Sequence, residues 1–210
     1  MQFYSKKLLQ PEKQPYAPGT ILFQGNNGAS GSVDFYPGVY YIRAQGGGGG
    51  GGNNVYSNGG GGGSGAGFEG YIRFLAEMPG TLVTAGTGGA GQTAGTATSI
   101  AGVLTLGGGL RGLENSIGKG GTLSWVNNNG GLYSVMSATV QRDGYDGVIP
   151  PNSATAVSGG NSVLTNSGGG LANAAATAPG AGGGGGYAWH RAGGAGMYGE
   201  ILISYERLRP

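Results

Sequence analysis

The sequence predicts a mainly β and irregular fold, in which short β-hairpins accompany a bundle of glycine helices and there is almost no α-helix. Glycine supplies 53 of the 210 residues, against an average near 7%. Each glycine inside a regular helix or sheet costs roughly 0.5–1 kcal/mol relative to alanine. Charged residues make up only 10% of the chain, against about 25% on average. These two features exclude an amphipathic helical fold.

Such a glycine content is also typical of disordered, low-complexity chains. Disordered chains, however, are poor in aromatic residues and rich in charge, whereas this chain has 12 Tyr, 5 Phe and 2 Trp. The aromatic content favours an ordered, glycine-rich architecture. Flexible linkers remain the alternative interpretation of the individual glycine runs.

Charge and cysteine content restrict the partners of the chain. The net charge is +2 and there is no cysteine, so neither a disulfide framework nor a thiol metal site is possible. Basic residues are mostly scattered singly, unlike the clustered Lys and Arg of nucleic-acid-binding proteins. The first residues lack the apolar run and cleavage site of a secretory signal, and no stretch approaches the 18 apolar residues of a membrane span. We therefore expect a protein made in a cytoplasm, with neither nucleic-acid binding nor membrane insertion.

Residues 1–19 are predicted to form an N-terminal docking arm. They contain three lysines and three prolines. Proline at this density excludes a long helix and favours an extended segment. The remaining residues, 20–210, are predicted to form a single glycine-rich domain.

Two β-hairpins are predicted in this domain, at residues 20–44 and 68–86. Runs of aromatic and β-branched residues bounded by turn residues indicate strands, and Pro37-Gly38 has the chemistry of a type II turn. Met78-Pro79-Gly80 has the same role in the second hairpin, and each hairpin leads directly into glycine-rich sequence. Further strands are predicted at 99–106, 122–126, 132–140 and, closing the chain, 199–208.

The longest glycine runs, including 46–52 and 180–186, have one ordered conformation open to them. This is the left-handed helix of three residues per turn, called polyglycine II when built of glycine, which has no internal hydrogen bonds and rises about 3.1 Å per residue. Its amides and carbonyls must find partners elsewhere, and only glycine lets such helices approach closely enough to pair. We therefore expect several runs to stack into a bundle with a backbone core and with loops at its ends.

The sequence carries no convincing enzyme, cofactor or metal motif. Matches to GxGxxG are expected by chance in a chain so rich in glycine, and none opens a helix. His190 is the single histidine; it could be a general base or ligand, but beside aromatic residues it is interpreted as a contact residue. Asp143 and Asp146 are too few for a calcium site of six to eight oxygens and are interpreted as part of a turn. We therefore expect a protein that is not an enzyme.

Polar, uncharged segments separate the glycine runs and hold the candidate binding residues. Tyr and Trp offer a large contact area at low entropy cost, while Asn and Ser adapt their hydrogen bonds. The candidate binding residues on these loops are Asn54, Tyr56, Asn128, Tyr145, Tyr187, Trp189, His190 and Arg191. The alternative for Tyr187 and Trp189 is packing over the end of the bundle, and for Trp125 packing within a strand.

Three segments together resemble the glycine-rich domain of phage tail-fibre proteins: SVDFYPGVYYIRAQGGGGGGG, GSGAGFEGYIRFLAEMPGTLVTAGTGGAG and GAGGGGGYAWHRAGGAGMYGEILISYE. The resemblance, which covers roughly residues 20–207, is to the placement of strands, polyglycine and a late closing strand. It extends in plan to the small adhesins of T-even long tail fibres, although this chain lacks their large N-terminal fibre-docking domain. It implies a sandwich of polyglycine II helices whose loops bind a host receptor.

The resemblance implies a phage-type adhesin or tail-tip protein of the virion. Its partners would be a host surface protein or glycan, bound by the loops, and other fibre subunits, bound through residues 1–19. One alternative is a purely structural fibre or decoration protein without receptor binding. Another is an ice-binding protein, since the segment GTGGAGQTAGTATS has the Thr and Ala of a flat face.

Overall fold

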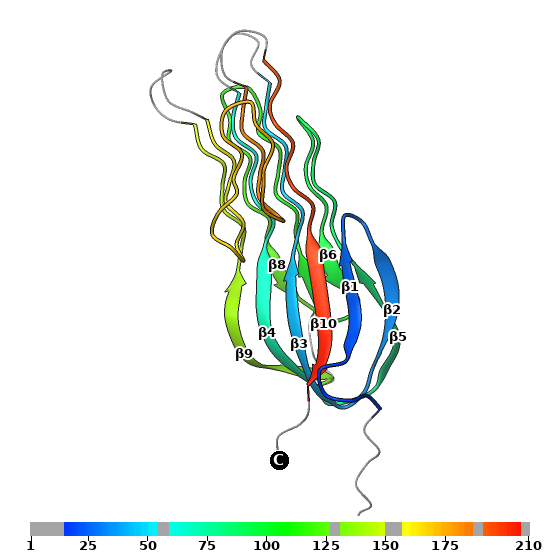
Figure 1. Cartoon of the computed structure of the whole chain (residues 1–210). Coiled ribbons are helices and arrows are strands. Elements are labelled where there is room, and N and C mark those ends of the chain that lie inside the picture. Colours follow the sequence, from blue (N-terminus) through cyan, green and yellow to red (C-terminus); the bar gives the residue numbers. More distant parts are fainter. Residues whose placement is uncertain (1–14, 54–58, 127–130, 150–156, 187–190, 207–210) are drawn as a thin grey trace, which may run out of the picture.

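The computed structural model describes residues 15–53, 59–126, 131–149, 157–186 and 191–206. Within them, two antiparallel sheets pack face to face, and extended glycine-rich segments continue the strands at one end (Figure 1). The strands are β1 (Ile21–Asn26), β2 (Ser30–Phe35), β3 (Gly38–Gln45), β4 (Gly67–Phe74), β5 (Met78–Thr84), β6 (Thr98–Ile100), β7 (Leu104–Leu106), β8 (Leu123–Trp125), β9 (Tyr133–Arg142) and β10 (Glu200–Glu206). The predicted mainly β chain is confirmed, and the described residues contain no α-helix.

Each sheet has five strands, in the orders β1-β10-β3-β4-β9 and β2-β5-β6-β7-β8. Side chains alternate between the faces of a strand, and the inward set is apolar. On β3, Tyr40, Ile42 and Ala44 are buried, whereas Tyr41 and Arg43 are partly exposed on the outer face. The two inner faces together form one apolar core. No helix in the described ranges is long and apolar enough to cross a membrane.

The predicted hairpins at 20–44 and 68–86 pair differently in the structure. β2 and β3 lie in different sheets, and so do β4 and β5. Pro37-Gly38 and the segment after β4 are therefore connections between sheets, not hairpin turns. The predicted turn residues Met78-Pro79-Gly80 begin β5, where Gly80 has a φ of 62°. Alternating hydrophobicity identified the strands but did not specify the sheet to which each belongs.

Tyr40 holds the connection between β2 and β3. Its buried hydroxyl donates to the Tyr36 carbonyl at 3.0 Å and accepts from the Tyr36 amide at 2.9 Å. Gly38 is needed for close approach, because a Cβ there would lie 2.9 Å from the Tyr205 ring. Gly38 is not among the described glycines with positive φ, so it does not have the type II geometry that the sequence predicted.

The hairpins of this molecule are longer than predicted, and the glycine segments form their outer halves. β3 pairs with β4, and the pairing continues beyond the strands in unchanged register, with Gly46, Gly49 and Gly52 donating to Ala66, Gly63 and Gly60. The pairs β5–β6 and β7–β8 continue in the same way. Figure 1 shows these segments rising together from one end of the sheets.

One further strand differs in detail from the prediction. Residues 99–106, predicted as one strand, are the two short strands β6 and β7, joined by a turn in which Gly102 has a φ of 74°. In the predicted arm, residues 1–14 lie outside the described residues. Tyr16 packs edge-on against Tyr36 and Tyr205, with both pairs of ring centroids 5.8 Å apart. The end of the arm thus packs on its own sheets.

Candidate functional site

Hydrogen-bonded glycine segments extend from the sheets to the far end of the molecule, which we call the distal end. The segment 46–52 is at their centre, and its amides donate in turn to three different neighbours. Gly46, Gly49 and Gly52 donate to residues 60–66, Gly47 and Gly50 to residues 93–96, and Gly48 and Gly51 to residues 194–197, at 2.8–3.0 Å. Every third residue therefore faces the same neighbour.

The carbonyls of this segment repeat the pattern toward three other neighbours. Gly47 and Gly50 accept from residues 109–112, Gly48 and Gly51 from residues 89–92, and Gly49 and Gly52 from residues 183–186. Six segments therefore surround one. Residues 59–66 and 180–186 are equally buried, and Gly49, Gly63, Gly62 and Gly183 link the three by hydrogen bonds of 2.8–2.9 Å. We call these three segments the inner tracts.

The glycines of the inner tracts leave no room for a Cβ, and the side chains within these tracts are the small ones of Ser64, Ala66 and Ala181. A Cβ on Gly47, Gly48 or Gly50 would overlap the carbonyl of Thr87, Ala181 or Ala90 respectively. All these obstacles are backbone atoms, which cannot rotate away. Backbone hydrogen bonding and close packing thus replace a side-chain core in this half of the molecule.

In the outer segments, side chains accept hydrogen bonds from backbone amides that no neighbouring carbonyl reaches. Asp143 accepts from the Leu123 amide at 2.6 Å, and Asp146 accepts from the Gly120 amide at 2.9 Å and from Lys119 Nζ at 2.7 Å. The hydrogen bond from Lys119 is the main reason that the pKa of Asp146 is lowered. The interpretation of this segment as a turn is wrong, because residues 143–149 are extended along residues 118–123. Among the described residues, no three acidic or histidine side chains gather in a way that could hold a metal.

Among the described residues, three tight turns close outer hairpins at the distal end. They span residues 90–93, 113–116 and 171–174, and each contains a non-glycine residue with positive φ, namely Gln92, Asn115 and Asn173. Asn tolerates this conformation better than most residues. The Gln92 amide donates to Gly51 and the Asn173 amide to Gly185, so these turns rest on the ends of inner tracts.

The ends of the inner tracts meet at the same place. Gly59 donates to Gly186 at 3.0 Å, and Gly186 donates to Gly52 at 2.8 Å. Asn53 accepts from the Gly193 amide at 3.1 Å. Gly52, Gly59 and Gly186 are therefore neighbours at the distal end.

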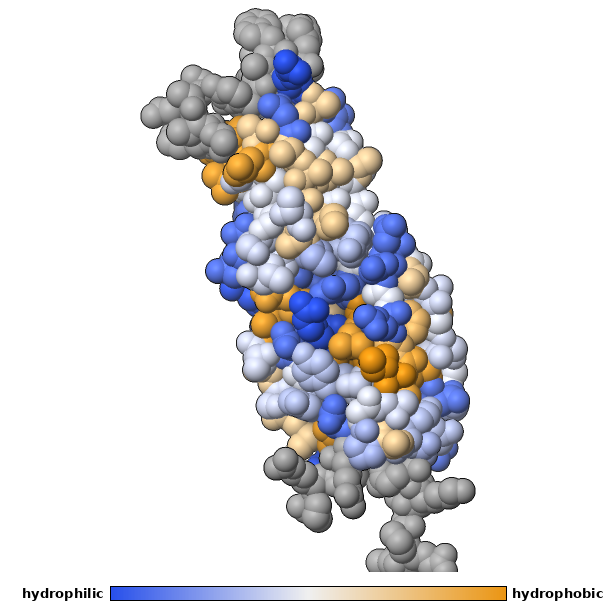
Figure 2. Space-filling model, in the orientation of Figure 1, coloured by the Kyte–Doolittle hydropathy of each residue, from blue (hydrophilic) through white to orange (hydrophobic). Residues whose placement is uncertain are grey.

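The described surface of the distal end combines amides and the Glu114 carboxylate with exposed leucines. Gln92, Glu114, Asn115 and Asn173 are exposed, and Leu113 and Leu171 are 45% and 65% exposed. Figure 2 shows hydrophobic residues on the surface near this end. Selection by aromatic content missed these residues. A signal for them exists in the short polar interruptions of glycine-rich sequence, such as Leu-Glu-Asn-Ser at 113–116.

The predicted binding residues fall into several groups. Asn54, Tyr56, Asn128, Tyr187, Trp189 and His190 lie outside the described residues. Arg191 is exposed and precedes the segment that pairs with 46–52. The residues flanking Asn128 lie at the opposite end of the sheets, where the Val126 amide donates to Val103.

Tyr145 lies beside the bundle, close to the sheets. Its backbone exchanges hydrogen bonds with Ser64, and the Arg142 guanidinium lies over its ring, 4.1 Å from the centroid. Tyr145 is thus distant along the bundle from Gly52 and Gly186.

Trp125 packs edge-on against Phe68, with ring centroids 5.3 Å apart, and contacts the core.

Threonines of the segment considered for ice binding form hydrogen bonds to neighbouring segments. Thr87 and Thr96 have their hydroxyl oxygens 3.0 Å apart, and the Thr87 amide also donates to the Thr96 hydroxyl. Thr98 is buried, and its hydroxyl donates to the Gln45 carbonyl at 2.7 Å. These hydroxyls connect neighbouring segments of the bundle.

No protein-family model matches the chain, and no curated protein matches its sequence.

Proposed function

We propose that the inner tracts are polyglycine II helices. A helix with three residues per turn turns its successive amides by a third of a circle. Residues 46–52 donate to three neighbours in rotation and accept from three others, which is what this helix requires. A helix without internal hydrogen bonds depends on such neighbours, so the tracts stabilise one another only as a bundle.

We further propose that the chain is a phage-type adhesin or tail-tip protein whose distal end binds a receptor on the host surface. The observation that carries this proposal is the polarity of the molecule. Gly19 donates to Tyr205 at 2.8 Å, so both ends of the described chain lie at the sheets, opposite the distal end (Figure 1). In this arrangement the sheets and residues 1–19 attach to a fibre and the distal end faces the host.

The chemistry of the distal end is consistent with this role. Its turns rest on backbone hydrogen bonds of buried tracts, so the exposed residues lose little conformational freedom when a partner binds. Its mixture of amides and apolar side chains suits a polar partner, either a surface protein or a glycan. Binding residues carried on loops by a rigid scaffold are a common arrangement.

Binding to bacterial cells tests the proposal. Fluorescently labelled protein is applied to a panel of bacterial strains, and unlabelled variants compete for binding. We expect Leu113→Asp combined with Leu171→Asp, and separately Tyr187→Ala combined with Trp189→Ala, to weaken competition about tenfold or more. Leu82→Asp is the matched control, because Leu82 is 54% exposed on the sheet that lacks β10.

Three outcomes would overturn the receptor-binding proposal: no binding to any strain, equal competition by all variants, or loss of competition by the control alone. If the protein were then found in many copies along a virion, a purely structural role would be favoured.

A further inference from the structure

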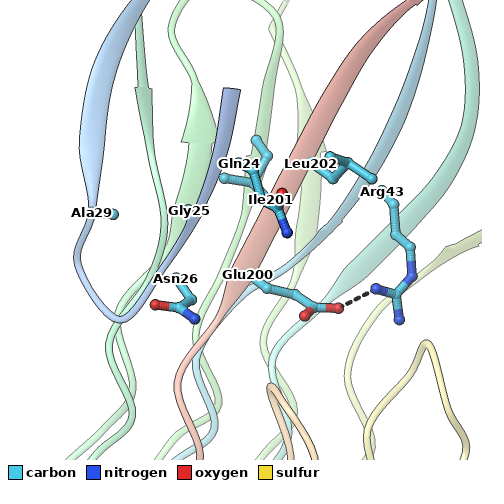
Figure 3. A pocket seen from close by; sticks show the side chains of 8 residues that line it. All are labelled: Gln24, Gly25, Asn26, Ala29, Arg43, Glu200, Ile201 and Leu202. Carbon is cyan, nitrogen blue, oxygen red and sulfur yellow. Dashed lines mark ion pairs between the residues drawn. The ribbon is translucent and has the colours of Figure 1, made fainter. Parts of the chain in front are cut away.

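A hollow of about 290 Å³ opens on the outer face of the sheet that contains β10, at its end near the bundle. β1, β3 and β10 supply its walls. Figure 3 shows Glu200 extended toward Arg43 and Asn26 on the opposite side of the hollow. The lining residues are Gln24, Gly25, Asn26, Ala29, Arg43, Glu200, Ile201 and Leu202.

Charge is balanced inside this hollow. The Arg43 guanidinium lies 2.6 Å from Glu200 and 4.0 Å from Glu69. Because the Glu200 carboxylate contacts it directly, the guanidinium is already paired and offers little to an anion. Glu200 is likewise paired, which disfavours a cation. The amide side chains of Gln24 and Asn26 add neutral donors and acceptors, and Leu202 adds an apolar surface.

A pair of tyrosines continues the same outer face, one row further along the strands. Tyr41 lies opposite Tyr71 in the β3–β4 pairing, with ring centroids 5.5 Å apart. The Tyr41 hydroxyl donates to Glu69 at 2.6 Å, which fixes the orientation of its ring. Tyr71 is 40% exposed. Aromatic rings held in this way offer an apolar surface beside polar groups.

Figure 2 shows hydrophilic and hydrophobic residues side by side over this part of the molecule. We propose that the hollow binds a neutral saccharide, with the amides, Arg43 and Glu200 contacting hydroxyl groups and the tyrosines extending the site toward a second sugar. Neutral hydroxyls need both donors and acceptors, and the hollow has both without net charge. Its volume, at the low end of ligand pockets, suits a small ligand. This site is separate from the distal end and does not depend on the receptor proposed there.

NMR on the ¹⁵N-labelled full chain tests this site. Glucose, galactose, mannose, N-acetylglucosamine and the disaccharides lactose and cellobiose are added at millimolar concentration, with sialic acid as an anionic probe. We expect at least one neutral sugar to shift the side-chain amides of Gln24 and Asn26. We expect Gln24→Ala to weaken that binding about tenfold, and Tyr71→Ala to remove any preference for a disaccharide. Gln141→Ala, an exposed position on β9, is the control and keeps full affinity.

The proposal is overturned if none of the neutral sugars shifts these amides, if sialic acid alone does so, or if Gln24→Ala binds as the unchanged protein does. Because the readout is local to the sheet, a failure here is distinguishable from a failure of cell binding by the distal variants.

Discussion

The amide of Gly49 donates to the carbonyl of Gly63 at 2.9 Å, in the register that pairs β3 with β4. Within β3 and β4, every residue of one strand lies opposite a residue of the other. Beyond Gln45, segments 46–52 and 60–66 are hydrogen-bonded to each other only at every third residue. The amides between them turn to other partners. A β-hairpin thus becomes part of a bundle without a change of register.

Replacing a buried glycine of the inner tracts should strongly destabilise the protein. A Cβ in Gly49→Ala would overlap the Leu110 carbonyl, and the surrounding backbone cannot yield without breaking hydrogen bonds. Overpacking usually lowers the free energy of unfolding by about 1–3 kcal/mol, and for Gly49→Ala we expect a loss at or above the upper end of this range. Denaturant unfolding measures this loss. Gly91→Ala is the comparison, because Gly91 is exposed and its Cβ would approach only the Gly193 carbonyl, with the oxygen 2.9 Å away; it should cost clearly less than Gly49→Ala.

Gln45 should be needed to join the sheets to the bundle. It is fully buried, with its amide placed so that the nitrogen donates to Ser162 Oγ at 2.8 Å and the oxygen accepts from the Val163 amide at 2.8 Å. Gln45→Leu leaves those partners unsatisfied, at an expected cost of about 1–3 kcal/mol. Hydrogen exchange should accelerate most at residues 162–164. An equal loss in Gln141→Leu, which alters an exposed glutamine, would contradict this role.

Asp146 should contribute to stability in a pH-dependent way. Its pKa is lowered in the folded state, first by the hydrogen bond from Lys119 and then by that from Gly120. A carboxyl with a depressed folded pKa stabilises the fold above its unfolded pKa of about 3.9 and loses that contribution as the pH falls through the folded value. Lys119→Met should raise the pKa of Asp146 toward its ordinary value, as NMR titration of the carboxyl would show. No change in this pKa would contradict the pairing.

Tyr40 should give the fold a dependence on alkaline pH. Burial raises its pKa to about 12. Because the folded state disfavours the phenolate, the stabilisation is full below the unfolded pKa of about 10 and is lost as the pH rises toward the folded value. Tyr40→Phe removes this part of the dependence. It also removes the hydrogen bonds to Tyr36, at a cost of about 1–2 kcal/mol at neutral pH. An unchanged alkaline profile in this variant would show that Tyr40 is not the group responsible.

The sequence indicated the strands but not their partners. Alternation of apolar residues marks β3 and β10 because one face of each is buried. The same alternation cannot tell whether Pro37-Gly38 reverses the chain within a sheet or carries it to the other sheet. The deciding contacts, such as Tyr205 against Gly38, join residues that are far apart in the sequence.

The site residues were harder to predict than the fold. Aromatic content directed attention to Tyr145, whose Arg142 and Ser64 contacts place it beside the bundle. The hollow was missed because Gln24, Arg43 and Glu200 come from three strands, and only the order of the sheet brings them together. The positions of the exposed turns at Gln92 and Asn115 depend on which segments are hydrogen-bonded to each other, and the sequence does not indicate these pairs.

Hydrogen exchange of the glycine amides is the most direct test of the bundle on which the distal end depends. If 46–52, 59–66 and 180–186 are polyglycine II helices bonded to their neighbours, their amides should exchange as slowly as those of β3 and β4, through global unfolding. If these amides exchange as fast as those of an unstructured chain while the strands stay protected, the runs are flexible linkers. The proposed scaffold for the distal end would then be contradicted.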